Sequence, residues 1–185
     1  MPRLHLVRHG HAAAGWDEER DPGLDLLGAR QADAVGLALQ QELSPRPIVS
    51  SPLRRAVETA GPLAARWNRP AAIDGAFGEI PSPTEDLALR QRWLRSALAG
   101  RWDQLDEAVE AWRRTLLAAV RTVEHDLVVF THFVAINAVV SEATGDPAVT
   151  TFLPANASVT VVDVAPGDGA ISLVQRGSEA ATEVG

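Results

Sequence analysis

The chain has 185 residues, which is enough to bury one hydrophobic core, and we expect a single domain. Hydrophobic residues make up 46% of it and charged residues 22%, as in soluble globular proteins, while the formal net charge of -7 disfavours binding to the phosphate backbone of nucleic acids. The sequence has no cysteine, which excludes disulfides and cysteine-ligated metals, and all 17 basic residues are arginine.

The hydropathy pattern contains no membrane or export signal. No apolar segment approaches the roughly 20 residues that a membrane-spanning helix needs, and the N-terminus lacks the basic, apolar and small-residue regions of a signal peptide. We therefore expect a cytoplasmic protein with neither nucleic acid nor membrane among its partners.

Apolar periodicity predicts strands and helices in alternation along the chain. A buried first strand is followed by a helix that Asp25 caps, because an aspartate at this position accepts hydrogen bonds from free N–H groups of the first turn. Ser51 is expected to cap the next helix, whose first position is Pro52. The expected strands are residues 3–7, 48–50, 71–73, 126–131, 158–164 and 170–175. The expected helices are residues 26–42, 52–67, 84–99, 103–124 and 133–143.

This alternation predicts an α/β fold with three layers, α/β/α, around a mostly parallel sheet. The turn at residues 166–169 (PGDG) predicts that the last two strands form a hairpin, which adds an antiparallel edge to the sheet. Residues 1–176 are expected to form the single domain, and the small and polar residues 177–185 a frayed tail.

Arginines, histidines and a glutamate directly follow several of the predicted strands. Ligands of open α/β sheets bind beyond the carboxyl ends of the strands, so we expect these side chains to form one site. The first strand is followed by Arg8, His9, Gly10 and His11, and the later strands by Arg55, Glu79, Thr131 and His132.

These residue types suit the transfer of a phosphoryl group. Arginines bind such a group with two hydrogen bonds at once, and the N-terminus of the helix expected at Pro52 would direct free N–H groups at the same anion. A neutral imidazole is a nucleophile near pH 7, whereas an imidazolium stabilises phosphoryl oxygens. Glu79 can protonate the leaving oxygen if burial raises its pKa, and Gly10 would let the backbone approach the anion closely. This chemistry requires no metal and no other cofactor.

Four segments resemble the histidine phosphatase superfamily, in its phosphoglycerate mutase-like branch. Residues 8–10 match the RHG motif of that family, and residues 51–60 (SPLRRAVETA) match its SPLxRAxxTA segment. Residues 77–80 (FGEI) fall where the family keeps its acid, and residues 129–132 (VFTH) resemble the strand that ends in its second histidine. The segments follow in family order over nearly the whole chain, so the resemblance implies the phosphoglycerate mutase-like fold.

The resemblance also implies a phosphoric monoester hydrolase of the histidine acid phosphatase type, acting on a small phosphorylated metabolite. His9 would attack phosphorus and become phosphohistidine, and Glu79 would protonate the leaving alcohol and then activate water. The expected catalytic residues are Arg8, His9, Arg55, Glu79 and His132, and the expected substrate-binding residues are Arg8, Gly10, His11, Arg55 and Thr131. Arg90, Arg92, Arg95 and Arg101 are expected on a solvated helix face.

Two departures and several alternatives accompany this hypothesis. His11 stands where members of the family often have Glu or Gln, and Gly15 stands where many have Asn. A metal hydrolase using His9 and His11 is disfavoured because the chain is shorter than the ~250 residues of a (β/α)₈ barrel and the arginines would repel a cation. A mutase, a protein-phosphohistidine phosphatase and a non-catalytic module that binds phosphorylated ligands stay open, although the short segment between the acid and the second histidine favours hydrolysis over a mutase.

Overall fold

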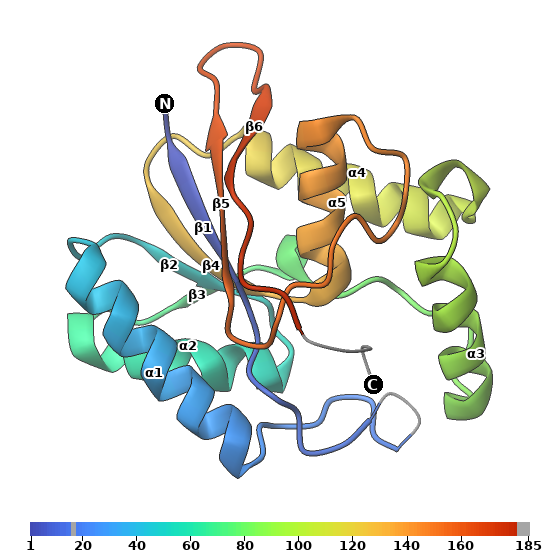
Figure 1. The fold of residues 1–185 in the computed structure, drawn as a ribbon, viewed down its shortest axis with the longest axis horizontal. Helices are drawn as coiled ribbons and strands as arrows, with labels where there is room; N and C mark the ends of the chain where they lie inside the picture. The colour runs from blue at the N-terminus through green and yellow to red at the C-terminus, as the bar shows by residue number, and fades with distance from the viewer. Residues whose placement is uncertain (16–17, 181–185) are drawn as a thin grey trace.

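The computed structural model describes residues 1–15 and 18–180, and within them one mixed sheet forms the centre of the molecule (Figure 1). Its strand order is β3-β2-β4-β1-β5-β6. The strands are β1 (Arg3–Arg8), β2 (Ile48–Ser50), β3 (Ala72–Ile73), β4 (Leu127–Thr131), β5 (Val159–Val164) and β6 (Ile171–Gln175). The α-helices are α1 (Leu26–Glu42), α2 (Arg54–Trp67), α3 (Leu87–Leu98), α4 (Glu107–Arg121) and α5 (Phe133–Thr144), and two 3₁₀ turns are η1 (Gly75–Phe77) and η2 (Trp102–Gln104).

The sheet is parallel from β3 to β1 and antiparallel at the β5–β6 edge, which confirms the predicted fold class. From β1 the chain moves outward to β2 and β3, and then returns to place β4 between β2 and β1. The carboxyl ends of β1, β2 and β4 therefore lie next to one another. A reversal of strand order of this kind is where ligands bind in open α/β sheets.

Alternating side chains of β1 and β4 separate the core into two halves. Leu6 and Val129 face the layer of α4 and α5, whereas Val7 and Phe130 face α1 and α2. Figure 1 shows these helix pairs on opposite sides of the sheet. Because both faces are covered, every residue of β4 is buried, and the strand ends are held in rigid positions.

Two predictions about helix starts are wrong. The second helix begins at Arg54 rather than at Pro52, and its N-cap residue, Leu53, makes no side-chain hydrogen bond. Ser51 lies two residues before the N-cap, where its hydroxyl accepts a hydrogen bond from the Leu53 N–H at 3.2 Å and lies 2.7 Å from a ring nitrogen of His132. The long helix expected from residue 103 begins at Glu107, after the 3₁₀ turn η2.

The predicted frayed tail is wrong for the residues that the structure describes. The Ala155 N–H donates to the Ser178 carbonyl at 2.8 Å, and the Ala180 N–H donates to the Leu153 carbonyl at 2.9 Å. Gly177 packs against Ser158, where a Cβ would come within 2.8 Å of the hydroxyl. Residues 178–180 are thus hydrogen-bonded to residues 153–155, and the last five residues of the expected tail lie outside the described part.

No helix among the described residues has the length and apolar character needed to cross a membrane.

Candidate active site

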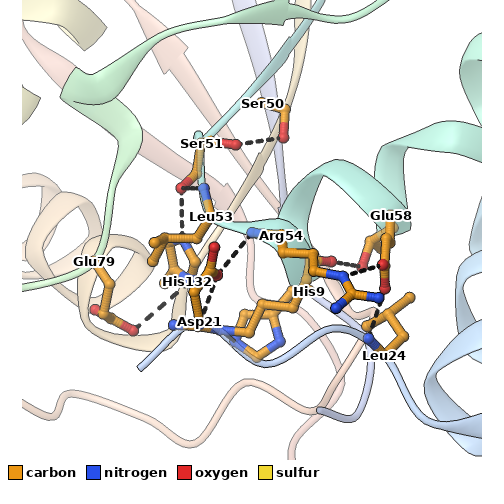
Figure 2. A network of polar contacts seen from close by, with 12 residues as sticks. His9, Asp21, Leu24, Ser50, Ser51, Leu53, Arg54, Glu58, Glu79 and His132 are labelled. Atoms are coloured by element: carbon orange, nitrogen blue, oxygen red, sulfur yellow. Dashed lines mark hydrogen bonds and ion pairs between the residues drawn. The ribbon is translucent and has the colours of Figure 1, made fainter. Parts of the chain in front are cut away.

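The pairing of β1 with β4 brings the two histidines of the predicted site together. Arg8 and Thr131 are partners in the parallel register, and the His9 N–H donates to the Thr131 carbonyl at 3.0 Å. The residues that follow, His9 and His132, therefore leave adjacent strands side by side, with ring centroids 5.2 Å apart. The end of β2 joins them because the Ser51 N–H donates to the Phe130 carbonyl at 2.9 Å. Figure 2 shows His9, His132 and Ser51 at this edge.

The ring of His9 is held in one tautomer by the backbone. Its Nδ1 lies 2.8 Å from the Gly10 carbonyl oxygen, which can only accept a hydrogen bond, so Nδ1 carries the proton. The lone pair is then on Nε2, which accepts a hydrogen bond from Nε of Arg55 at 3.1 Å. Burial, aided by the charges of Arg55 and Arg8, holds the pKa of His9 well below its usual value. His9 is therefore a neutral imidazole near pH 7 with its reactive nitrogen inside the site.

Two buried arginines flank His9. Arg8 donates from Nη1 to the Pro154 carbonyl at 2.7 Å and lies over the Phe133 ring, 5.2 Å from its centroid. Burial lowers the pKa of Arg8 to about 10, so the side chain remains a cation near neutral pH. Arg55 is only 4% exposed and contacts His9 directly. Two buried guanidinium groups around one imidazole form a strongly positive site, which is suited to a phosphoryl group.

His132 and Glu79 face each other across the site. Nε2 of His132 lies 2.7 Å from the Ser51 hydroxyl, and its Nδ1 lies 4.0 Å from Oε2 of Glu79. The other Glu79 oxygen, Oε1, accepts a hydrogen bond from the Ile80 N–H at 2.9 Å. Nδ1 of His132 and Oε2 of Glu79 have no hydrogen-bond partner among the described residues although both are buried. These two atoms are thus available to a reacting group (Figure 2).

The environment of these two groups favours their neutral forms. Burial raises the pKa of the Glu79 carboxyl, although nearby arginine charges act in the opposite direction. Burial also holds the pKa of His132 well below its usual value, and the neighbouring His9 adds to this effect. A carboxyl group that stays protonated at higher pH than usual is suited to act as a general acid.

Two hydrogen bonds hold the segment that carries Glu79. The Thr131 hydroxyl donates to the Phe77 carbonyl at 2.6 Å, and the Trp112 indole N–H donates to the Gly78 carbonyl at 3.3 Å. Thr131 was a predicted substrate-binding residue, but its hydroxyl is buried and bonded to the chain just before the acid. The Thr131 hydroxyl thus holds the chain just before Glu79, and a role of Thr131 in substrate binding stays a prediction.

Gly10 packs closely against α1, and the predicted approach of its backbone to an anion stays a prediction. A Cβ at this position would come within 2.6 Å of the Gly28 carbonyl oxygen in α1. The Gly10 N–H donates to the Thr59 hydroxyl at 2.9 Å, and that hydroxyl donates to the Arg55 carbonyl at 2.6 Å. Thr59, which the sequence analysis missed, thus connects the residue after His9 to the backbone of Arg55.

His11 contacts Asp25 at the start of α1. Its Nδ1 lies 2.8 Å from Oδ2 of Asp25, whose other oxygen accepts from the Gly28 N–H and caps α1, as predicted. The His11 side chain is half exposed. The structure does not bring His9, His11 and His132 into one cluster, and no group of three or more histidine or carboxylate side chains in residues 1–15 and 18–180 is arranged to hold a metal ion. Gly15, the other departure from the family pattern, donates its N–H to Oε2 of Glu18 at 2.9 Å.

Asp21 occupies the helix N-terminus that was expected to bind the anion. Its Oδ1 accepts a hydrogen bond from the Arg54 N–H at 2.8 Å and lies 3.8 Å from Nη1 of Arg55 (Figure 2). The loop that carries Asp21 is fixed to α2 by Glu58, which accepts from the Leu24 N–H at 2.6 Å. The expectation that this helix end offers free N–H groups to a phosphoryl group is therefore wrong for the Arg54 N–H. The sequence holds no signal for this contact because 33 residues separate its partners.

The site is completed by Asn156, whose side-chain amide donates to the His9 carbonyl at 3.1 Å.

Comparison with known proteins agrees with the sequence resemblance. The family model of the histidine phosphatase superfamily, branch 1, matches residues 4–176. The chain belongs to this superfamily.

The chain is similar to an uncharacterised protein of Mycobacterium tuberculosis strain H37Rv, Rv0525, with 42% identity over 76 residues. That match spans 39% of this chain and only 37% of the relative. Among solved structures, one described as mycobacterial hydrolase 1 is 25% identical, with a TM-score of 0.73 and coverage of 97% of this chain and 100% of that one.

Two phosphatases share the fold. Mycobacterial glucosyl-3-phosphoglycerate phosphatase is 24% identical, with a TM-score of 0.71 and coverage of 97% of this chain and 100% of that chain. Phosphoserine phosphatase from Entamoeba histolytica is 21% identical, with a TM-score of 0.71 and coverage of 96% and 98%. These neighbours have the phosphoglycerate mutase-like architecture, which confirms the predicted fold.

Proposed function

We propose that this protein is a metal-independent phosphomonoesterase that hydrolyses a small phosphorylated metabolite through a phosphohistidine intermediate on His9. The observation that carries the proposal is the state of His9: a backbone carbonyl fixes the proton on Nδ1, and the Nε2 lone pair accepts a hydrogen bond from the buried Arg55. An uncharged nucleophile beside fixed positive charge is what attack on a phosphate dianion requires.

The first half-reaction follows from the contacts of the site. Nε2 of His9 attacks phosphorus, and the bond between phosphorus and the leaving oxygen breaks. Arg8 and Arg55 bind the transferring phosphoryl oxygens, and the proton of Glu79 passes to the leaving alcohol. His132 lies between Glu79 and Ser51 and contributes a further donor to the phosphoryl group. The products of this step are the free alcohol and a phosphorylated His9 beside an ionised Glu79.

The second half-reaction regenerates the enzyme. Oε2 of Glu79, now ionised, removes a proton from water, and the resulting hydroxide oxygen attacks phosphorus. The bond from phosphorus to Nε2 of His9 breaks, and inorganic phosphate leaves. Burial supports both roles because a carboxylate left in this environment regains its proton readily.

A pair of variants tests this assignment. His9→Ala should abolish hydrolysis in a screen of sugar phosphates, nucleotides and phosphoglycerates, whereas His125→Ala, which changes an exposed histidine, should not. Rapid acid-free quenching of the wild type with a ³²P-labelled substrate should trap acid-labile phosphate that is absent from His9→Ala. A wild type that is inactive on the whole screen would contradict the proposal and favour a non-catalytic phospho-ligand module.

Glu79→Gln separates the two half-reactions. It should lower kcat for alkyl phosphates by about 10²–10⁴-fold, the usual range for a general acid. With 4-nitrophenyl phosphate, whose leaving group needs no proton, it should still give a burst of nitrophenol followed by slow turnover. A burst that is lost together with alkyl phosphate hydrolysis would contradict the role of Glu79.

Unchanged activity in the presence of a chelator is expected, and strong inhibition by the chelator would favour the metal hydrolase.

A further inference from the structure

A cavity of about 690 Å³ lies between η2, the first half of α4 and the end of α5. Its lining, as the described residues form it, contains none of the side chains of the proposed active site. Ser141 in the lining is roughly 12 Å along α5 from Phe133, where this helix begins at the active site. The Trp102 N–H donates to the Pro147 carbonyl at 3.1 Å and joins two of the walls. The volume is in the range of small-molecule sites.

Two buried hydrogen-bond donors of the lining have no acceptor. Trp102 is only 9% exposed, and its indole Nε1 has no hydrogen-bond partner among the described residues. The same is true of Nε of Arg113, whose guanidinium lies over the Trp102 ring, 4.9 Å from its centroid. A buried donor without an acceptor costs free energy, so such groups are rare in folded proteins. Two of them on contacting side chains favour a ligand that supplies acceptor oxygens, such as a carboxylate.

The exposed charges of the lining compensate one another. Arg101 and Asp103 form an ion pair at 3.2 Å, and Glu110 forms one at 2.8 Å with Arg114, which lies outside the lining. These pairs add no net charge to the cavity. Arg101 is exposed here, as predicted, whereas Arg90 in α3 is partly buried, so the prediction of a solvated position is wrong for Arg90.

Two further charges of the lining are not compensated in this way. Glu142 is shared by two arginines, Arg113 at 3.1 Å and Arg121, so this group has one more positive charge than negative. Asp146 forms no ion pair with any described residue, and its Oδ1 accepts the Ala148 N–H at 3.0 Å. A ligand with one negative and one positive group would compensate both, whereas a simple carboxylate or a simple amine would leave one of them.

We propose that this cavity is a second ligand site, which binds a free α-amino acid with an apolar side chain. The carboxylate of the amino acid accepts hydrogen bonds from Nε of Arg113 and from the Trp102 indole N–H, and its ammonium group pairs with Asp146. Leu105 and Val109 supply apolar surface for its side chain. The site is separate from the proposed phosphomonoesterase chemistry and does not depend on it.

Isothermal titration calorimetry of the full-length protein tests this site with L-valine, L-leucine and L-methionine as probes. At least one of them should bind, with one ligand per chain. Two analogues of each probe then remove one charge at a time: the carboxylic acid that lacks the amino group, and the amine that lacks the carboxylate. Each analogue should bind at least about tenfold more weakly than its amino acid, because it leaves one charge of the cavity uncompensated.

Two variants, each with a matched control, locate the binding. Trp102→Phe and Asp146→Asn should each raise Kd by about 10–100-fold, as expected for the loss of a charge-assisted hydrogen bond. Trp67→Phe should keep the wild-type Kd, because Trp67 has the same unpartnered indole Nε1 but does not line the cavity. Asp168→Asn should also keep it, since Asp168 accepts the N–H two residues further on, as Asp146 does, in a different turn. Thermal unfolding of each variant reports the fold.

Three results would overturn the inference. The first is that none of the three amino acids binds to the wild type. The second is that a carboxylic acid without the amino group binds as tightly as its amino acid, which would leave Asp146 without a role. The third is that folded Trp102→Phe and Asp146→Asn bind as the wild type does, which would place the ligand elsewhere. Because binding is measured without a phosphorylated substrate, none of these results depends on the proposed phosphatase activity.

Discussion

Asp21 brings a negative charge to the place where the phosphoryl group is proposed to bind. Its carboxylate accepts the Arg54 N–H and lies 3.8 Å from the Arg55 guanidinium. It stabilises the start of α2 and balances part of the buried positive charge. A phosphoryl group that approaches Arg55 therefore meets electrostatic repulsion from Asp21, partly screened because the Asp21 side chain is 45% exposed.

Asp21→Asn should strengthen the binding of inorganic phosphate. The amide oxygen can still accept the Arg54 N–H, but the charge is removed, so Ki for phosphate should fall by about threefold, the effect of one partly screened charge at this range. Asp33→Asn, which changes an exposed surface partner of Arg66, should leave Ki unchanged. Competitive inhibition at fixed ionic strength measures both values. A Ki that rises in Asp21→Asn would mean that the carboxylate is needed to hold Arg55 in position.

The sequence predicted the site residues that follow the strands, but not those that other segments bring to the site through long-range contacts. Arg8, His9 and His132 follow paired parallel strands, so the expectation that they lie together needed only the topology of the sheet. Asp21 belongs to a loop whose position depends on long-range contacts, and the local sequence pattern carries no information about these contacts. Gly10 was singled out correctly as special, but its physical reason, contact with Gly28, required the packed structure.

At the scale of elements, the contact between the end of β1 and the start of α1 determines the shape of the site. A Cβ on Gly28 would come within 2.0 Å of the His11 carbonyl oxygen, and a Cβ on Gly10 would meet the Gly28 carbonyl. The two glycines allow the backbone after His9 to pass directly over α1. Any side chain at Gly28 must displace the segment that positions the nucleophile.

Gly28→Ala should therefore lower both stability and activity, although alanine normally favours a helix. Ala29→Gly is a matched control on the exposed side of the same turn, and it should cost about 1 kcal/mol of unfolding free energy through helix propensity alone. Urea unfolding and kcat/KM on the best substrate measure both effects. We expect Ala29→Gly to keep wild-type kcat/KM and Gly28→Ala to lose at least about tenfold, which corresponds to ~1.4 kcal/mol of transition-state stabilisation. Equal kcat/KM in the two variants would contradict the role of this contact.

Most element positions were predictable because burial produced clear periodicity. The five residues of β4 are all buried, and α1 has its predicted bounds and its predicted cap. The start of α2 was wrong: Ser51, a favourable capping residue by sequence, lies before the helix and its hydroxyl contacts both the Leu53 N–H and His132 of the site. A residue can thus contact both the site and the chain that leads into a helix, which shifts the helix start from the position that its local sequence predicts.

At the scale of the whole molecule, the buried ionisable groups couple the fold to pH. The pKa values of His5, His9 and His132 are lowered chiefly by burial. In the unfolded chain each histidine has a pKa near 6.5. The stability that each histidine contributes is present above this pH and is lost as pH falls through the pKa of the folded state. Glu79 acts in the opposite sense, because a raised pKa contributes stability that is present below the unfolded value and is lost as pH rises through the folded pKa.

The free energy of unfolding should therefore fall as pH is lowered from 7 to 5. Over this range the three buried histidines lose their contribution to stability, and only Glu79 gains one. His132→Asn should make this decline shallower, and Glu79→Gln should make it steeper. His125→Asn, at an exposed position, should reproduce the wild-type slope. Urea unfolding at intervals of half a pH unit gives the slopes, and only the slopes are compared since each variant shifts the absolute stability. A His132→Asn slope equal to that of the wild type would show that the histidine is not kept neutral by the fold.

The hydrogen bond from Trp112 to the Gly78 carbonyl has a spectroscopic consequence. The indole N–H of α4 is bonded to the peptide group that precedes Glu79, so a movement of the backbone at Gly78 and Glu79 would stretch or break this bond. Indole emission responds to the loss of such a partner. The difference spectrum between the wild type and Trp112→Phe is thus an intrinsic optical signal for the position of the acid during turnover, and it requires no attached dye.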